Sequence, residues 1–321
     1  MVSKYNLAQL PTPLQKLSNL SRKLGGPEIY IKRDDLTGLA FGGNKTRKLE
    51  ILISRALEEG ANLVLTTGAA QSNHCRQTAA AAAAAGLDCR LILVGSKDTT
   101  FSGNLFLDQL LGSEIIWTDL EDRDLTLQQE FNQAAQDGMS PYLIPYGGSN
   151  QYGAFAYLLA VEELNEQMAD QLPDWIVFAS SSGGTQAGLA AGVHLNQLPI
   201  KVLGISVDEP ERKLKLKVAA LAGEAIALSG SKHDFQPDEI LVNSDFRGGG
   251  YGVLGDLEKS AIQMFAHEEG ILLDPVYTGR AAGGLISLIK QGYFSSHDKV
   301  LFWHTGGTPG LFAEQYLPRL V

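Results

Sequence analysis

The chain has few cysteines, no excess of positive charge and no long apolar run. Among its 321 residues only Cys75 and Cys89 are cysteines, too few for a disulfide scaffold and without a C-x-x-C pair for zinc. The formal net charge of −10 argues against nucleic acid or an anionic membrane as a partner. No stretch reaches the length of a membrane span, and no signal-peptide pattern is present. We therefore expect reduced thiols, a cytoplasmic location, a small-molecule ligand and no metal.

The composition is that of a soluble globular enzyme or binding protein. Apolar residues make up 44% of the chain and charged residues 19%. A chain of 321 residues is longer than one hydrophobic core usually fills. The length therefore predicts two lobes, each with its own core.

Apolar, strand-like runs alternate with helical segments along most of the chain. Such alternation predicts right-handed βαβ units and parallel sheets, and therefore an α/β fold. We expect a small lobe from 52–146 and a large lobe from 1–51 and 147–321. A long helical pattern at 151–170 begins the later part of the large lobe. The predicted strands are 63–67, 90–94, 114–117, 142–145, 175–179 and 201–207.

The N-terminal region reads as one short helix followed by a strand. Thr12 and Pro13 resemble a helix cap and first turn, and leucines recur at helical spacing from Leu14 to Leu24. The run 28–32 is strand-like. Further along, Asp274 and His304 each follow an apolar run that we interpret as a strand, and polar side chains in that position bind ligands in open α/β sheets.

The stretch from Gly42 to Lys45 combines a tight turn with a lysine at the start of a helix. Gly42, Gly43 and Asn44 suit the turn, and Lys45 begins a pattern with a 3.6-residue period. The helix dipole and burial both lower the pKa of such a lysine. A neutral amine is a nucleophile that forms a Schiff base with a carbonyl cofactor. The alternative is that Lys45 is one of several solvated cations in a basic run.

Two other strand-to-helix connections carry polar groups suited to binding a ligand. The segment 180–188 is rich in serine and glycine and leads from a buried strand into a helix, so its N–H groups and hydroxyls favour an anion such as phosphate. The segment 71–74 also follows a strand, and Ser72 or Asn73 suits a helix N-cap. For both segments, a purely structural turn or cap is the alternative interpretation.

Five motifs in order resemble one family. They are 41–45 (FGGNK), 71–74 (QSNH), 251–253 (YGV), 274–279 (DPVYTG) and 304–307 (HTGG). Together they resemble the D-cysteine desulfhydrase and 1-aminocyclopropane-1-carboxylate deaminase family, and the likeness runs from Thr12 to Phe312. That family belongs to the tryptophan-synthase-β-like enzymes of fold type II, which use pyridoxal 5′-phosphate. The resemblance implies two α/β lobes, each a largely parallel twisted sheet flanked by helices, with 52–146 closing over a cofactor cleft.

The resemblance also implies a role for each matching residue. Lys45 matches the lysine that holds the cofactor as a Schiff base and moves protons at the substrate's α-carbon. Asn73 matches the group beside the cofactor's phenolic oxygen, and Thr278 the partner of its ring nitrogen. The implied catalytic residues are Lys45, Ser72, Tyr251 and Tyr277. The implied cofactor contacts are Lys45, Asn73, Ser182, Gly183, Gly184, Thr185, Thr278 and Thr305, with the phosphate held by those at 182–185. The implied substrate contacts are Gln71, Ser72, Asn73, Tyr251 and Tyr277, with the carboxylate held by Gln71 and Ser72.

The resemblance implies β-elimination from D-cysteine, releasing pyruvate, hydrogen sulfide and ammonia, by a homodimer with no nucleic-acid or membrane partner. The deaminase branch has a glutamate where this chain has Thr278, and a hydroxyl does not keep the ring nitrogen protonated. Departures from the desulfhydrase patterns occur at 181–184 and 253–255. Deamination of aminocyclopropane carboxylate, sulfite elimination from L-cysteate, and a phosphate-binding module without catalysis remain alternatives.

Overall fold

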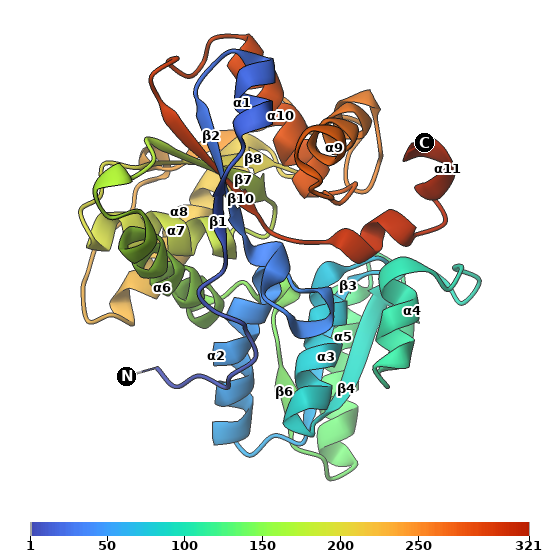
Figure 1. Ribbon diagram of the computed structural model, residues 1–321. Helices are drawn as coiled ribbons and strands as arrows, with labels where there is room; N and C mark the ends of the chain where they lie inside the picture. Colours follow the sequence, from blue (N-terminus) through green and yellow to red (C-terminus); the bar gives the residue numbers. More distant parts are fainter. Residues whose placement is uncertain (1, 321) are drawn as a thin grey trace.

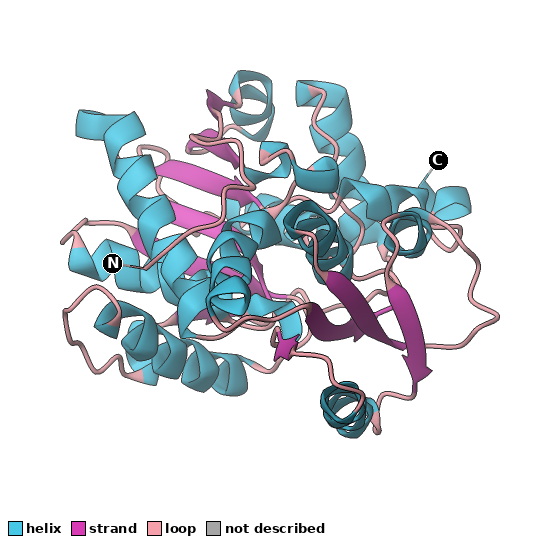
Figure 2. Ribbon diagram, turned by 90° about the horizontal axis from the view of Figure 1, so that it is seen from below, coloured by secondary structure: helices cyan, strands magenta, loops and turns pink. Residues whose placement is uncertain are grey.

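The computed structural model describes residues 2–320, apart from the side chain of Asp170, and contains two separate β-sheets flanked by helices (Figures 1 and 2). Each sheet is wholly or largely parallel. The predicted α/β fold class is therefore confirmed. One sheet takes its strands from both ends of the chain, and the other takes them from a single internal stretch.

The larger sheet brings together early and late parts of the sequence. Its strands are β1 (Leu14–Lys16), β2 (Glu28–Arg33), β7 (Trp175–Ser180), β8 (Lys201–Ser206), β9 (Leu241–Asn243) and β10 (Lys299–His304). Their order is β1-β2-β10-β7-β8-β9, and β1 is antiparallel to β2 whereas the other pairs are parallel. Strand β7 is buried along its whole length, as expected of a parallel strand covered by helices on both faces.

The smaller sheet is continuous in sequence and entirely parallel. Its strands are β3 (Leu63–Ala69), β4 (Asp88–Val94), β5 (Glu114–Thr118) and β6 (Pro141–Leu143). Their order is β5-β4-β3-β6. All four lie inside the stretch 52–146 predicted for the small lobe, close to the predicted strand positions.

Helices cover both faces of each sheet. The helices are α1 (Ser18–Leu24), α2 (Asn44–Glu58), α3 (Asn73–Ala85), α4 (Gly103–Leu110), α5 (Arg123–Gln136), α6 (Gln151–Met168), α7 (Gly184–Leu195), α8 (Glu211–Ala227), α9 (Asp256–Glu269), α10 (Thr278–Lys290) and α11 (Leu317–Leu320). Residues of α6 and α7 pack with β7 and β10 on one face of the larger sheet, and α1, α9 and α10 pack on the other. On the smaller sheet, α2, α3 and α4 share a core with β3 and β4, opposite α5.

Two predictions about local structure are wrong. Residues from Leu14 to Lys16 form a strand, not the first turns of a helix, and α1 begins only at Ser18. The strand wins because its backbone pairs with Tyr30, Ile31 and Lys32 of β2, a partner far away in sequence. The apolar run before Asp274 likewise forms no strand: Ile271 and Leu273 are buried, whereas Leu272 is 47% exposed.

Helix α2 lies between the two sheets, and its N-terminus faces both. Leu49 and Ile53 pack in the core of the smaller sheet, whereas Ile51 packs with residues of α6 and α7. The predicted boundary between residues 51 and 52 falls inside this helix. Because α2 contacts both lobes, its first residues are held where the lobes meet.

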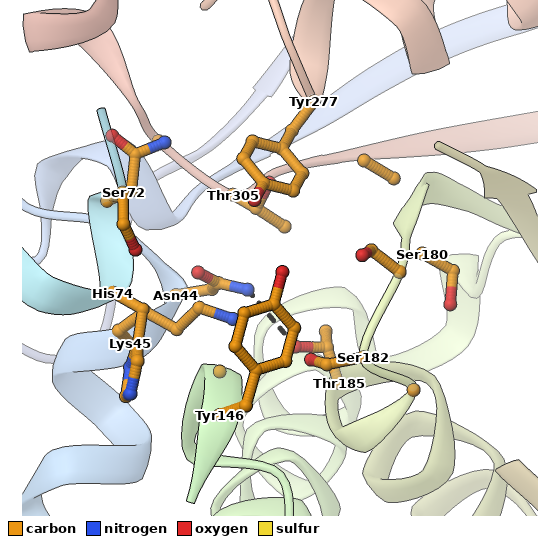
Figure 3. A pocket seen from close by; sticks show the side chains of 16 residues that line it. Asn44, Lys45, Ser72, His74, Tyr146, Ser180, Ser182, Thr185, Tyr277 and Thr305 are labelled. Atoms are coloured by element: carbon orange, nitrogen blue, oxygen red, sulfur yellow. Dashed lines mark hydrogen bonds between the residues drawn. The ribbon is translucent and has the colours of Figure 1, made fainter. Parts of the chain in front are cut away.

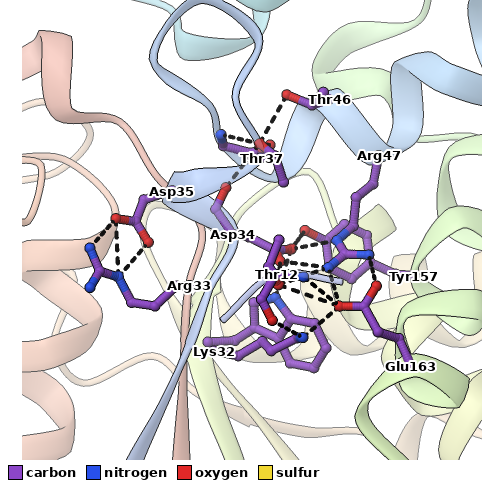
Figure 4. Close-up of polar contacts among 12 residues, drawn as sticks. Thr12, Lys32, Arg33, Asp34, Asp35, Thr37, Thr46, Arg47, Tyr157 and Glu163 are labelled. Carbon is purple, nitrogen blue, oxygen red and sulfur yellow. Dashed lines mark hydrogen bonds and ion pairs between the residues drawn. The ribbon is translucent and has the colours of Figure 1, made fainter. Parts of the chain in front are cut away.

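A buried cluster of charged and polar groups anchors α2 to the larger sheet (Figure 4). Arg47 donates to both oxygens of Asp34, with Nε–Oδ2 and Nη2–Oδ1 distances of 3.0 and 2.9 Å, and pairs with Glu163 at 2.8 Å. Tyr157 and Trp303 also donate to Asp34. Burial alone would raise the pKa of the Asp34 carboxyl, but Arg47 and the other donors hold it below its ordinary value. The cluster thereby holds α2 in place at Arg47, which is two residues after Lys45.

Candidate active site

A pocket lies where the first turns of three helices meet the ends of two strands of the larger sheet (Figure 3). Helices α2, α3 and α7 each point an N-terminus at it, and β7 and β10 end beside it. This is the carboxyl edge of a parallel sheet, where open α/β folds bind their ligands. Its lining consists of Asn44, Lys45, Ser72, Asn73, His74, Tyr146, Gly147, Ala179, Ser180, Ser181, Ser182, Gly183, Thr185, Tyr277, Thr305 and Gly306.

Lys45 is in the first turn of α2 and its side chain lines this pocket. The turn before it needs glycine: Gly42 and Gly43 have φ values of 64° and 126°, and a Cβ on Gly42 would lie 2.2 Å from the Asp35 carbonyl oxygen. Loss of solvation in the pocket lowers the pKa of the Lys45 amine to about 8. A substantial fraction of the amine is therefore neutral, and nucleophilic, near neutral pH.

A second lysine, Lys48, stands one turn further along α2, and the sequence reasoning overlooked it. Its side chain is fully buried, and its Nζ donates to the Gly147 carbonyl at 3.2 Å and to Ser149 Oγ at 3.4 Å. Burial and the neighbouring Lys45 lower its pKa well below the ordinary value. The sequence pattern does point to Lys48, because residues three apart on a helix share a face and Lys48 is three residues after Lys45.

The serine- and glycine-rich loop connects β7 to α7 at the edge of the pocket. Gly183 has φ = 86°, and a Cβ on Gly184 would lie 2.6 Å from Ser149 Oγ and 3.0 Å from Lys48 Nζ. Ser182 Oγ lies 2.7 Å from Ser149 Oγ. The start of the 12-residue helix α7 and the loop hydroxyls therefore converge beside a lysine, an arrangement that favours an anion.

Ser72 and Asn73 line the pocket from the smaller sheet's side. Ser72 is the N-cap of α3 and accepts a hydrogen bond from the Cys75 backbone N–H at 3.2 Å. Both interpretations of this residue are thus compatible, since it caps the helix and also faces the pocket. Asn73 Oδ1 accepts from Asn104 Nδ2 at 2.9 Å.

Tyr277 lines the pocket, and its hydroxyl lies 2.7 Å from that of Tyr251. Burial raises the pKa of both phenols well above the ordinary value. Each phenol therefore keeps its proton at neutral pH. The pair provides a proton donor on the side of the pocket nearest α10.

The structure does not bring every predicted site residue to the pocket wall. Gln71, Gly184, Tyr251 and Thr278 are not among the lining residues. The Gln71 amide accepts from the Asn104 N–H and donates to the Ser102 carbonyl. The Thr278 hydroxyl is fully buried and donates to Asp274 Oδ1 at 2.7 Å while it accepts from the Asp274 N–H. The single hydroxyl proton of Thr278 is therefore already donated to Asp274 and not to a ligand.

His74 and Tyr146 line the pocket although no motif argument singled out their side chains. Thr66 Oγ1 donates to the Ile144 carbonyl, so the contact with His74 Nε2 at 2.8 Å requires a proton on that nitrogen. Burial and the neighbouring lysines lower the pKa of His74 well below its usual range. His74 is thus a neutral wall of the pocket.

A comparison of the sequence with family models explains this arrangement. The model described as "Pyridoxal-phosphate dependent enzyme" matches residues 5–306. The chain belongs to this family. Membership confirms the resemblance seen in the five motifs and makes the protein a pyridoxal-phosphate-dependent enzyme.

Relatives within the pyridoxal-phosphate-dependent enzymes match almost the whole chain. D-cysteine desulfhydrases of Salmonella typhi and Salmonella newport are each 42% identical over 317 residues, which is 97% of this chain and 95% of theirs. A crystal structure of an ACC deaminase homologue is 38% identical, covers 99% of this chain and 95% of its own, and superposes with a TM-score of 0.89. These similarities confirm the fold-type-II architecture.

The pocket of this pyridoxal-phosphate-dependent enzyme fits the cofactor. A lysine amine with a lowered pKa suits the aldehyde, and the helix start with its glycines suits a phosphate. Within residues 2–320, the buried Ser180 Oγ beside that loop has no hydrogen-bond partner, which leaves it available to a ligand. Lys45 would hold the aldehyde carbon, and Ser182, Gly183, Gly184 and Thr185 would hold the phosphate.

In the part of the chain that the structure describes, no three His, Cys, Asp or Glu side chains are grouped to hold a metal ion. Over residues 2–320, no helix has the length and apolar character needed to cross a membrane.

Proposed function

We propose that this enzyme catalyses β-elimination from D-cysteine, releasing pyruvate, hydrogen sulfide and ammonia. The single observation that carries the proposal is Lys45, an amine with a pKa near 8 in a pocket that also holds Ser72 and Tyr277. The 42% identity to relatives named D-cysteine desulfhydrase supports the choice of substrate.

Bound pyridoxal phosphate supplies the electron sink that makes the substrate's α-hydrogen acidic. The protein chooses which bond breaks. Lys45 takes the proton from the α-carbon, and the Cβ–S bond then breaks as the sulfur leaves with its electron pair. The released 2-aminoacrylate takes up one water molecule, whose oxygen replaces the amino group, and this gives pyruvate and ammonia. Tyr277, backed by Tyr251, donates a proton toward the leaving sulfur. Ser72 and Asn73, with Gln71 behind them, hold the substrate from the smaller sheet's side.

Two of the three threonines proposed as cofactor contacts, Thr278 and Thr305, have different surroundings. Thr305 lines the pocket, whereas Thr278 uses its hydroxyl on Asp274. We therefore assign the contact with the cofactor ring to Thr305 and give Thr278 the task of holding Asp274 and the start of α10. Neither residue is an acid that keeps the ring nitrogen protonated. The α-carbon's electron pair is then drawn less strongly into the ring, which favours departure of a good leaving group over ring opening.

The division into 1–51 with 147–321 and 52–146 remains part of the proposal, with 52–146 closing over the cleft. Support comes from the location of the smaller sheet in 52–146 and of Ser72 and Asn73 on that side. We also propose a homodimer, since Leu36 and Phe41 beside the lysine turn are 44% and 63% exposed. Cytoplasmic residence is consistent with the free thiols of Cys75 and Cys89.

The test is a comparison of substrates with the purified holoenzyme. Pyruvate and sulfide release would be measured with D-cysteine, L-cysteine and β-chloro-D-alanine, and pyruvate or α-ketobutyrate release with cysteate and aminocyclopropane carboxylate. We expect the highest kcat/KM with D-cysteine among the natural substrates. A clear preference for aminocyclopropane carboxylate or for L-cysteate would overturn the proposal.

A further inference from the structure

A chain of hydrogen bonds runs from Arg76, buried behind the pocket, to Asn73 in the pocket wall. Arg76 Nη1 donates to Asn104 Oδ1 at 3.0 Å, and Asn104 Nδ2 donates to Asn73 Oδ1 at 2.9 Å. The side chains of Arg76 and Asn104 are both inaccessible to solvent. Neither residue lines the pocket, and no motif drew attention to them.

The guanidinium sets the direction of every hydrogen bond in this chain. Burial lowers the pKa of Arg76 to about 10, so at neutral pH it remains protonated and has donors only. Asn104 must therefore turn its oxygen toward Arg76 and its NH₂ group toward Asn73. Asn104 Nδ2 also donates to the Gln71 carbonyl at 3.0 Å, so both of its protons are used. The position of Asn104 is held further by the bond from its backbone N–H to Gln71 Oε1.

The consequence reaches the pocket through the Asn73 amide. Because Asn73 Oδ1 accepts the bond from Asn104, Asn73 Nδ2 is the amide atom that remains to face the pocket. Among the described residues, Asn73 Nδ2 donates no hydrogen bond, and it lies in the pocket wall near Gly307. A rotated amide would instead show a carbonyl oxygen to the pocket. An amide N–H favours an anionic or phenolic oxygen, whereas a carbonyl repels it.

The same arginine also contacts the lysine turn. Arg76 Nη2 donates to the Gly42 carbonyl at 2.9 Å, three residues before Lys45. A single guanidinium on α3 thus bonds both to the turn that presents the amine and to Asn104, which in turn donates to Asn73. Its donor-only chemistry gives both contacts one defined polarity.

We propose that Arg76 and Asn104 are positioning residues that lock the Asn73 amide with its NH₂ group toward the cofactor's phenolic oxygen. The inference rests on the proposed role of Asn73 beside that oxygen. It predicts that the cofactor senses the direction of hydrogen bonding two residues away. Substitutions that change the direction should alter cofactor affinity and the visible absorption of the bound cofactor without unfolding the protein.

The key variant is Asn104→Asp. The carboxylate keeps the bond from Arg76 and matches the size of the amide, but it donates nothing to Asn73, whose NH₂ group then turns away from the pocket. We expect the Kd for pyridoxal phosphate to rise about tenfold or more, since a hydrogen bond to a charged group is lost. The visible absorption band of the bound cofactor should shift and titrate at a different pH. Because the Gln71 carbonyl also loses its donor, melting temperature should fall, so Kd and spectrum are measured where circular dichroism shows the variant to be folded.

Two further variants separate direction from charge. Asn104→Leu removes the donor without adding a carboxylate. The Asn73 amide then has no preferred orientation, but it is not forced to point its NH₂ group away from the pocket. The effect of Asn104→Leu on Kd and spectrum should therefore be smaller than that of Asn104→Asp. Arg76→Lys keeps an N–H donor for Asn104 Oδ1 and should retain the wild-type spectrum. A wild-type Kd and spectrum in folded Asn104→Asp would overturn the inference, and so would an Asn104→Leu effect as large as that of Asn104→Asp.

The outcome is separable from that of the proposed function. If the wild-type enzyme binds pyridoxal phosphate but does not turn over D-cysteine, the substrate proposal fails while the graded spectral series still supports the positioning role. If D-cysteine is the substrate and the Asn104 and Arg76 variants all have the wild-type spectrum and Kd, only the positioning role fails.

Discussion

Asn44 Nδ2 donates to Thr185 Oγ1 at 3.1 Å, and this contact joins the first residue of α2 to the first turn of α7. The lysine that would carry the cofactor and the loop that would hold its phosphate are therefore tied to each other directly. Two helix N-termini from distant parts of the chain face one pocket, and the tie fixes the distance between the amine and the anion site.

Lys45→Ala should abolish the yellow colour of the purified enzyme and lower kcat by about 10²–10⁴-fold, because the amine is both the attachment point and the proton carrier. Borohydride reduction followed by peptide mapping should place the pyridoxyl group on Lys45 of the wild type. The exposed Lys97→Ala serves as the matched control and should stay yellow. Recovery of the label on any other lysine would refute the assignment.

Attachment of the cofactor should depend on pH with a midpoint near the pKa of Lys45, which is about 8. The neutral amine reacts, and its fraction grows as the pH rises through that pKa. The rate at which apoenzyme regains its visible absorption should increase about tenfold between pH 6 and 7 and level off above roughly pH 9. Nα-acetyl-lysine amide, with an ordinary pKa, should show no plateau in that range. A midpoint above pH 10 in the enzyme would contradict the burial argument.

Gly184→Val should weaken binding of pyridoxal phosphate by about tenfold or more, equivalent to roughly 1.4 kcal/mol. The reason is that even the Cβ would lie 2.6 Å from Ser149 Oγ and 3.0 Å from Lys48 Nζ, so the loop must move. Gly223→Ala is the control, because a Cβ there meets only the His233 carbonyl, at 3.4 Å. Equilibrium titration followed by absorption gives both Kd values. Unchanged affinity in Gly184→Val would exclude this loop as the phosphate site.

Ser72 offers a way to separate capping from catalysis. Ser72→Ala removes both the cap and the pocket hydroxyl, and it should cost about 1 kcal/mol of stability as well as turnover. Ser72→Asp keeps a side-chain acceptor for the Cys75 N–H but has no hydroxyl, so it should lose turnover while its melting temperature stays near that of the wild type.

Asn73→Ala leaves the Ser72 cap in place and should therefore also reduce kcat far more than stability. Thermal melts and steady-state kinetics on the same preparations make the comparison. If activity and melting temperature fall in proportion in all three variants, these residues are helix caps and no more.

Arg47→Met should destabilise the fold by about 3–5 kcal/mol, because it leaves the buried Asp34 carboxylate without its cation and leaves Glu163 with Lys32 alone. Arg55→Met, which removes a partly exposed pair with Glu58 on the same helix, should cost no more than about 0.5 kcal/mol. Urea unfolding of the apoenzymes measures both. Equal costs for the two variants would show that the buried cluster does not anchor α2.

The same cluster predicts an acid dependence. The folded-state pKa of Asp34 is held below its ordinary value of 3.8, so its contribution to stability is present above that value and is lost as the pH falls through the lower, folded-state pKa. The stability difference between wild type and Asp34→Asn should therefore shrink on acidification. A difference that stays constant down to the acid transition would contradict the assigned ionisation.

The sequence alone determined the class of fold, the family and most of the pocket. Parallel strands were predicted because apolar runs and helical periods alternate over short distances, and a local pattern of that kind survives folding. Lys45, Ser72, Asn73, Ser182, Gly183, Thr185, Tyr277 and Thr305 were predicted, and the structure brings all eight to one pocket. Such residues belong to short motifs at the ends of strands, which a parallel sheet gathers at one edge.

Only the tertiary structure decided the features that depend on partners distant in sequence. Leu14 to Lys16 became a strand because β2 offered its edge, and the Thr278 hydroxyl was used by Asp274 instead of facing the pocket. Lys48 and Asn104 carry no motif, yet burial and hydrogen bonds to residues far along the chain give them their places beside the site. Periodicity and motif spacing describe neighbours in sequence, whereas the polarity of a buried hydrogen-bond chain is set by which side chains the fold brings together.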